Sequence, residues 1–136
     1  KNDEIKIIEN DTYNLLNQSK LALVTSGTAT LETALFKVPQ VVCYKSSRIS
    51  YQIAKRLIKV KHISLVNLIL DKECVKELIQ SNLTKKNIKI ELNKLLNPVC
   101  KTKILKDYES LAEKCGGAGA SKITATRMLK TIKSLS

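Results

Sequence analysis

Three small residues between two apolar segments are the strongest candidates for chemistry in this sequence. Ser26, Gly27 and Thr28 follow the short apolar run 21–25 and open a helix-compatible segment. At such a turn the free backbone N–H groups and the positive end of a helix dipole face a bound phosphate. Glycine lets the backbone come close to the ligand, and the two hydroxyls add donors. The turn predicts a phosphate site, although a glycine between strand and helix also occurs for purely geometric reasons.

One acidic residue stands close behind this turn. Glu32 lies four residues after Thr28, on the same face of the expected helix. Its carboxylate either accepts hydrogen bonds from a ribose or sugar, or is a surface acid favoured by the helix dipole. The turn matches neither G-x-x-x-x-G-K-[ST] nor G-x-G-x-x-G, so no Walker loop and no dinucleotide fingerprint is predicted.

Further polar candidates lie near other expected junctions of strands and helices. Asn67, Glu77 and Gln80 could contact a ligand, but Asn67 could equally cap or turn the backbone, and the other two could be solvated. The single histidine, His62, has no acid partner at the level of sequence, so nucleophilic catalysis finds no support. The four cysteines form no CxxC pair, which predicts no metal site and favours reduced thiols in a cytosolic protein.

The elements that must position these residues follow an α/β pattern. Buried strands are expected at 21–25 and 40–44, with a helix over 29–37 between them that ends at Val38-Pro39. Strand, glycine turn, helix and strand form a right-handed βαβ unit. The apolar run 62–69 predicts a third strand.

The remainder of the chain is helical by pattern. A basic amphipathic helix is expected over 49–60, with Lys55, Arg56 and Lys59 on a face that is either solvated or in contact with anionic lipid or phosphate. The remaining helices are expected over 72–80 with Asp71 as N-cap, 85–96 with Thr84 as N-cap, 99–114, and 121–135 with Ser121 as N-cap.

Composition adds a bound on the partners. The 136 residues carry 24 Lys and Arg against 12 Asp and Glu, a formal net charge of +12, which indicates an anionic partner or an A/T-rich genome. Because only three arginines and five aromatic residues are present, dense base readout and base stacking are disfavoured. With 43% hydrophobic residues the chain has enough apolar side chains for a core.

Four motifs in order give the sequence a family resemblance. SGTATLE at 26–32, PQVVCYK at 39–45, ISLVNLI at 63–69 and KELIQ at 76–80 resemble the C-terminal half of lipid-A-disaccharide synthases, GT-B glycosyltransferases of Gram-negative bacteria. The closing GGAGAS at 116–121 resembles Bacteroidetes-type members. The resemblance implies an α/β, Rossmann-like C-terminal domain with a parallel sheet flanked by helices and a helical C-terminal third. Residues 1–115 would be the donor-binding part, and 116–136 a glycine turn and C-terminal helix.

The resemblance also implies an activity. The family transfers 2,3-diacylglucosamine from UDP to 2,3-diacylglucosamine 1-phosphate (lipid X), which yields the β-1′,6-linked disaccharide of lipid A, part of lipopolysaccharide, and UDP. No metal or cofactor is implied, because helix amides and basic residues neutralise the departing diphosphate. By motif match Ser26, Gly27 and Thr28 would bind the diphosphate and Glu32 the ribose or sugar. Asn67, Glu77 and Gln80 would line the donor cleft.

The implied partners follow from the same resemblance. The catalytic residues are expected in an N-terminal acceptor domain that this chain lacks, so the chain alone is expected to be inactive. A homodimer and a cytoplasmic location at the anionic surface of the inner membrane are implied, without nucleic acid. Val66 stands where many relatives have Pro, which puts the rigidity of that loop in doubt. The alternatives are another GT-B UDP-sugar transferase or epimerase, and a non-catalytic basic α/β module that binds RNA.

Overall fold

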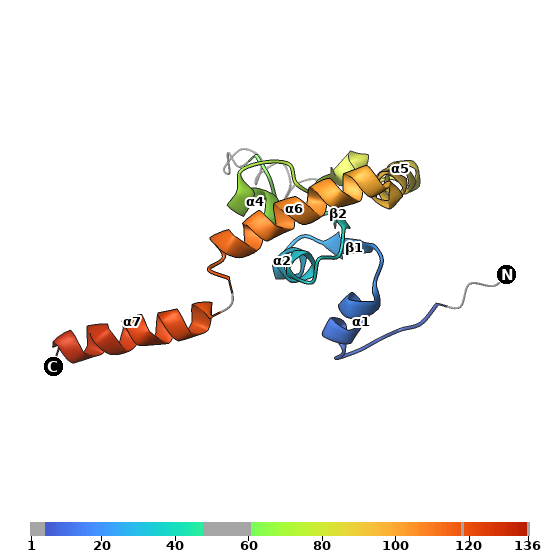
Figure 1. The fold of residues 1–136 in the computed structure, drawn as a ribbon. Coiled ribbons are helices and arrows are strands. Elements are labelled where there is room, and N and C mark those ends of the chain that lie inside the picture. Colours follow the sequence, from blue (N-terminus) through green and yellow to red (C-terminus); the bar gives the residue numbers. More distant parts are fainter. Residues whose placement is uncertain (1–4, 48–60, 118, 136) are drawn as a thin grey trace.

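A small parallel sheet organises the chain (Figure 1). The computed structural model describes residues 5–47, 61–117 and 119–135. The sheet has three strands in the order β1 (Ala22–Thr25), β2 (Gln40–Tyr44) and β3 (Lys76–Ile79). Both pairings are parallel, with Val42 of β2 level with Val24 of β1 and with Glu77 of β3. The predicted α/β class and parallel sheet are therefore confirmed.

Helices make up most of the remaining described residues. They are α1 (Thr12–Gln18), α2 (Thr28–Leu35), α4 (Leu65–Leu70), α5 (Lys85–Leu96), α6 (Pro98–Lys114) and α7 (Ala120–Leu135), with the short 3-10 turn η1 (Gln80–Asn82) after β3. Helices α2, α4 and α6 contact one another, and α5 lies against β2, β3 and α6. The helical C-terminal third predicted from the sequence is thus present.

The βαβ unit over residues 22–44 forms as predicted. Helix α2 begins after Gly27 and ends at Leu35, and Lys37 then takes a left-handed conformation with φ 59°. The N–H of Val38 donates to the carbonyl of Thr33, which closes the last turn before Pro39 leads into β2. The unit is specified locally, because an apolar strand, a glycine turn and a proline stop follow one another in the sequence.

Two predictions for residues 62–80 were wrong. The expected strand over 62–69 is helix α4, whose N-cap Ser64 accepts a hydrogen bond from the N–H of Asn67. The expected helix over 72–80 is instead strand β3, and Asp71 ends α4 in a left-handed conformation with φ 51° rather than starting a helix. The apolar run is short enough to fit the two-residue period of a strand or the 3.6-residue period of a helix. The buried positions Val66 and Leu70 follow the helical spacing.

The later helix boundaries are mostly confirmed. The hydroxyl of Thr84 accepts the N–H of Asn87 at the start of α5, and Asn97 caps α6, which has Pro98 in its first turn. The prediction of Ser121 as the N-cap of the last helix was wrong, because α7 already includes Ala120. The predicted basic helix over 49–60, with Lys55, Arg56 and Lys59, lies outside the described residues.

The core lies where α2, α4 and α6 meet one face of the sheet. Its buried members come from four elements and one loop: Ala34, Val42, Val66, Leu70, Val75, Ile104, Tyr108 and Leu111. A buried polar contact crosses this core, since the side-chain N–H of Gln40 donates to the carbonyl of Thr30 at 2.8 Å and to the Tyr108 hydroxyl at 3.4 Å. Helix α6 is therefore fastened to the βαβ unit by both apolar and polar contacts.

Helix α7 lies apart from this core. Figure 1 shows it projecting away from the body of the ribbon after the glycine-containing segment that follows α6. Its apolar residues Met128, Leu129 and Ile132 are 62%, 59% and 64% exposed. No helix within residues 5–47, 61–117 and 119–135 has the length and apolar character needed to cross a bilayer.

Candidate functional site

The turn between β1 and α2 leaves open space in front of a helix N-terminus. Gly27 is the N-cap of α2 and has φ 140° and ψ −163°, a conformation that side chains other than glycine rarely adopt. A Cβ atom placed on Gly27 would meet no atom of residues 5–47, 61–117 and 119–135 within 4 Å. The turn therefore requires glycine for its backbone conformation, and it offers an unobstructed approach to the first amides of the helix.

Two hydroxyls hold this turn and a third is open. The Ser26 hydroxyl donates to the carbonyl of Ile63 at 3.0 Å, and the Thr30 hydroxyl donates to the carbonyl of Gly27 at 2.8 Å. Thr28 is exposed, and none of the residues that the structure describes forms a hydrogen bond with its hydroxyl. The Thr28 hydroxyl is thus the one at this turn that is free to donate to a ligand, whereas the Ser26 proton is already used.

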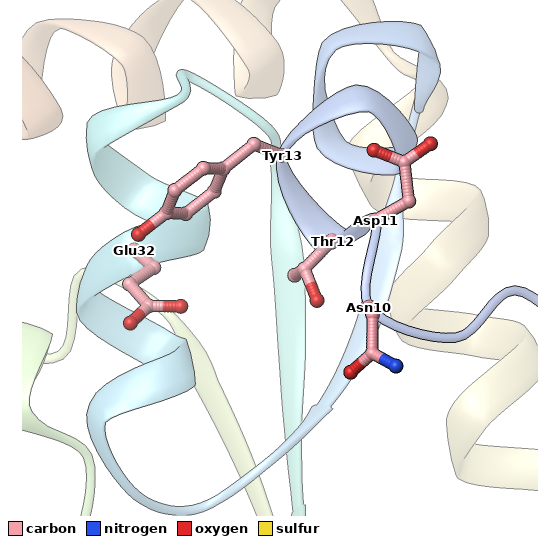
Figure 2. Close-up of a pocket in the computed structure, with 5 residues that line it drawn as sticks. All are labelled: Asn10, Asp11, Thr12, Tyr13 and Glu32. Carbon is pink, nitrogen blue, oxygen red and sulfur yellow. The ribbon is translucent and has the colours of Figure 1, made fainter.

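Glu32 lies in a separate, open surface pocket (Figure 2). The pocket has a volume of about 300 Å³ and is lined by Asn10, Asp11, Thr12, Tyr13 and Glu32. Figure 2 shows the aromatic ring of Tyr13, from α1, lying over the part of α2 that carries the Glu32 carboxylate. The Tyr13 ring is fixed by stacking on Phe36, with 5.2 Å between the ring centroids. Carboxylate, amide and hydroxyl groups together suit a ligand rich in hydroxyls.

Sequence reasoning missed the α1 side of this pocket. Residues 10–13 carried no motif, and they meet Glu32 only because α1 packs beside α2. The polar run Asn10-Asp11-Thr12 just before the apolar spacing of α1 was the available signal, since such residues often begin helices.

Asn67 and Glu77 are brought together, but their bonding groups face the protein. Asn67 is fully buried, and its Nδ2 donates to the carbonyl of Val75 at 2.8 Å and to Oε1 of Glu77 at 2.9 Å. Its Oδ1 accepts the N–H groups of Cys74 and Val75 at 2.8 and 2.9 Å. The amide of Asn67 therefore has all of its hydrogen-bonding groups satisfied within the chain.

The Glu77 carboxylate accepts hydrogen bonds from the two residues that precede α4. It accepts the N–H of Ile63 at 3.2 and 3.0 Å on its two oxygens, and on Oε1 it accepts the N–H of Ser64 at 3.0 Å and the Ser64 hydroxyl at 2.8 Å. A carboxylate at a helix N-terminus is favoured by the helix dipole and by unpaired amides. This arrangement anchors residues 63–64 beside the Ser26 hydroxyl.

Gln80 is placed at the end of β3, apart from this network. Its Nε2 donates to the Ser46 hydroxyl at 3.0 Å, which joins the end of β3 to the segment after β2. The predicted donor-cleft residues thus fall into two groups, one at the α4 N-terminus and one beside Ser46. No group of three potential metal ligands occurs among residues 5–47, 61–117 and 119–135.

Burial perturbs the acidity of two thiols and one tyrosine, and one of these groups, Cys43, is level with Thr25 directly before the turn. Burial raises the pKa of the Cys74 thiol to about 12, and burial also raises the pKa of Cys43 and, more strongly, that of the Tyr108 hydroxyl. All three are held in their neutral forms at neutral pH. The chemistry of the turn is therefore that of hydrogen-bond donors and a helix dipole.

This combination of fold and turn defines a Rossmann-like α/β domain of the kind found in GT-B glycosyltransferases. Ligands of open parallel sheets bind beyond the carboxyl ends of the strands, where Gly27 stands. A family model described as lipid-A-disaccharide synthetase matches residues 1–130. The chain belongs to the lipid-A-disaccharide synthetase family.

Individual relatives agree with this assignment. The chain is similar to a protein named lipid-A-disaccharide synthase from Syntrophus aciditrophicus, with 38% identity over 130 residues that cover 95% of this chain and 34% of the relative. A protein of the same name from Psychromonas ingrahamii is 49% identical over 92 residues, 68% of this chain and 24% of the relative. A third, from Geobacter sulfurreducens, is 32% identical over 130 residues, 95% and 34% of the two chains. The chain covers 24–34% of the length of these curated relatives.

Proposed function

We propose that this chain is the donor-nucleotide-binding part of a lipid-A-disaccharide synthase. The complete enzyme would transfer 2,3-diacylglucosamine from UDP to 2,3-diacylglucosamine 1-phosphate and release UDP. The observation that carries the proposal is the open Gly27 turn at the carboxyl end of β1 in a member of this family. Residues 1–115 would form the donor-binding part, and residues 116–136 the connecting glycine segment and last helix.

The diphosphate would be bound at the start of α2. Gly27 has no side chain to cap the helix, so its first amides can donate to phosphate oxygens, and the exposed Thr28 hydroxyl adds a donor. Ser26 would act mainly by holding the turn through Ile63. As charge develops on the leaving UDP, these fixed donors would stabilise it without a metal ion.

The ribose or sugar would occupy the pocket that contains Glu32. The Glu32 carboxylate would accept hydrogen bonds from vicinal hydroxyls. Asn10 and Thr12 would supply both hydrogen-bond donors and acceptors. The stacked Tyr13 forms an apolar wall that suits the face of a sugar or a base. Asn67 and Glu77 would stabilise the backbone beside the donor cleft, and Gln80 would line the cleft where β3 ends.

The remaining partners follow from the surfaces that the fold leaves exposed. The apolar residues of α7, together with Ile5 and Ile7, which are 92% and 85% exposed, offer contact area for an acceptor domain or for a second copy of the chain. The catalytic residues would come from that acceptor domain. The high positive charge, with Lys55, Arg56 and Lys59, would attract a cytoplasmic enzyme to the anionic inner membrane where its acylated substrates lie.

Titration with nucleotides tests the donor-site proposal. UDP, UDP-N-acetylglucosamine and ADP are titrated by calorimetry at fixed salt into the chain and into Gly27→Val, which places a branched side chain in front of the helix amides. The matched control is Gly119→Val, because Gly119 also has a positive φ and open space around its Cβ position. Glu32→Gln tests the sugar pocket.

The proposal predicts a clear order of affinities. UDP and UDP-N-acetylglucosamine bind in preference to ADP, Gly27→Val loses the binding, and Gly119→Val keeps it. Glu32→Gln weakens binding by about 2–10-fold, as expected for one charged hydrogen-bonding group. A folded chain that binds no UDP, or that binds ADP equally well, contradicts the proposal.

A further inference from the structure

One carboxylate joins two segments that are far apart in the sequence. Glu77, on β3, accepts both backbone N–H groups of Ile63 and Ser64, and the carbonyl of the same Ile63 accepts the hydroxyl of Ser26. The strand β2 lies between β1 and β3 in the sheet, so residues 63–64 connect the carboxyl end of β1 with Glu77, the second residue of β3. The Ser26–Gly27 turn is therefore connected to Glu77 through a single peptide segment.

The chemistry of this connection favours a rigid arrangement. The Glu77 carboxylate accepts from three different residues, at distances of 2.8–3.2 Å. Hydrogen bonds to an ionised acceptor are stronger than those between neutral groups. Asn67, which is fully buried, donates to the same oxygen Oε1 and is itself held by the backbone of residues 74–75.

We propose that Glu77 is a positioning residue that holds the nucleotide turn in place by fixing Ile63 and Ser64, and through Ile63 the Ser26 hydroxyl. This differs from direct contact with the donor, because Oε1 of Glu77 accepts from Ile63, Ser64 and Asn67, and Oε2 accepts the N–H of Ile63. The proposal rests on the proposed function insofar as the turn binds nucleotide. The mechanical connection between Glu77 and the turn can be tested without any ligand.

The ligand-free experiment uses backbone ¹⁵N relaxation of the full 136-residue chain. In Glu77→Gln one carboxylate oxygen becomes an amide that opposes the backbone N–H groups. We expect order parameters near 0.85 at residues 63, 64 and 27 to fall toward 0.6 or below. The matched control, Glu73→Gln, removes a carboxylate whose ion pair with Lys76 is exposed, and should change none of them.

The ligand-binding experiment tests whether Glu77 and Ser26, which are connected through Ile63, affect UDP binding through the same contact. We expect Glu77→Gln and Ser26→Ala each to weaken UDP binding by about tenfold. The double variant should bind no more weakly than the weaker single variant, because both changes break the same connection. If Glu77 acted only on global stability, the two effects would multiply instead.

The two experiments separate failure of this inference from failure of the proposed function. If the wild-type chain binds no UDP, the proposed function fails, and the relaxation data alone decide the connection. If Glu77→Gln loosens residues 63–64 while the turn at Gly27 stays rigid, the inference is overturned whatever the chain binds. Should Glu77→Gln not fold, Ser64→Ala takes its place, since it keeps the carboxylate and removes one donor to it, together with the side-chain cap of α4.

Discussion

The side chain of Asn67 forms two hydrogen bonds with the backbone of Val75, as a residue on a neighbouring strand would. Its Nδ2 donates to the carbonyl of Val75 at 2.8 Å while its Oδ1 accepts the N–H of the same residue at 2.9 Å. One side chain in helix α4 thereby satisfies both backbone groups of the residue that leads into β3. This pairing explains why a polar residue is fully buried between α4 and the sheet.

Replacing Asn67 by Ala should destabilise the fold strongly. The N–H and the carbonyl of the buried Val75 would lose the bonds to Asn67, and the N–H of Cys74 would keep only its bond to the carbonyl of Lys72, at a total cost of about 2–4 kcal/mol. Urea unfolding followed by circular dichroism measures the change. Asn93→Ala, on the exposed side of α5, is the control and should stay within about 0.5 kcal/mol of wild type. Equal midpoints for the two variants would contradict the assignment.

Truncation of the core at Leu111 tests the packing of α6. Leu111 is completely buried in the cluster formed with α2 and α4, so Leu111→Ala leaves a cavity and should lower the free energy of unfolding by about 2–5 kcal/mol. Leu96→Ala is the matched control, because Leu96 is 62% exposed at the end of α5. A loss below about 1 kcal/mol at Leu111 would show that α6 does not pack as described.

Gly27→Ala isolates the backbone requirement of the turn from its ligand. Because a Cβ there meets no atom of the described residues within 4 Å, we expect the penalty to come from the conformation at φ 140°, at a cost of about 1–3 kcal/mol of stability. Thermal unfolding measures it. Gly117→Asn is the comparison, since φ 60° is a left-handed conformation that asparagine tolerates. A Gly27→Ala chain as stable as wild type would mean that the turn relaxes to another conformation.

Cysteine labelling tests the burial of Cys74. The thiolate is the reactive form, and burial raises the pKa of Cys74 to about 12, so at pH 8 iodoacetamide should modify the exposed Cys100 first. Raising the pH from 8 to 10 should speed labelling of Cys74 by about tenfold per unit, since the pH stays below its pKa. Peptide mass spectrometry reads both sites. In urea the two rates should converge; equal rates in the folded chain would show that Cys74 is not buried.

The sequence predicts the first βαβ unit well and the next segment poorly, for a physical reason. An apolar run, Gly27 and Pro39 specify residues 22–44 through local backbone preferences. Residues 63–77 depend on Glu77 and Asn67, whose side chains bond to backbone groups up to 14 positions away, and no propensity or period contains such contacts. For the same reason Ser26 could be predicted as part of the turn, but its partner Ile63 could not.

The pocket around Glu32 shows a similar division. The sequence predicts Glu32 as a candidate site residue from its place one turn after Thr28, within a single helix. Its opposite wall comes from residues 10–13, and their position depends on the packing of α1 and on the stacking of Tyr13 on Phe36. Such packing depends on how the side chains of α1 and α2 fit together in space, and the spacing of apolar residues within either helix does not predict it.

The separation of α7 from the core gives the chain two different responses to heat. Sixteen residues form this helix, and those from 122 to 132 are exposed, so its order depends on its own backbone hydrogen bonds. A helix of that length without packing partners is marginal in water and melts gradually. The β1–α6 body unfolds cooperatively around its buried cluster. Ellipticity at 222 nm would therefore drift with temperature well before the body's sharp transition, and a partner that covers α7 would merge the two into one.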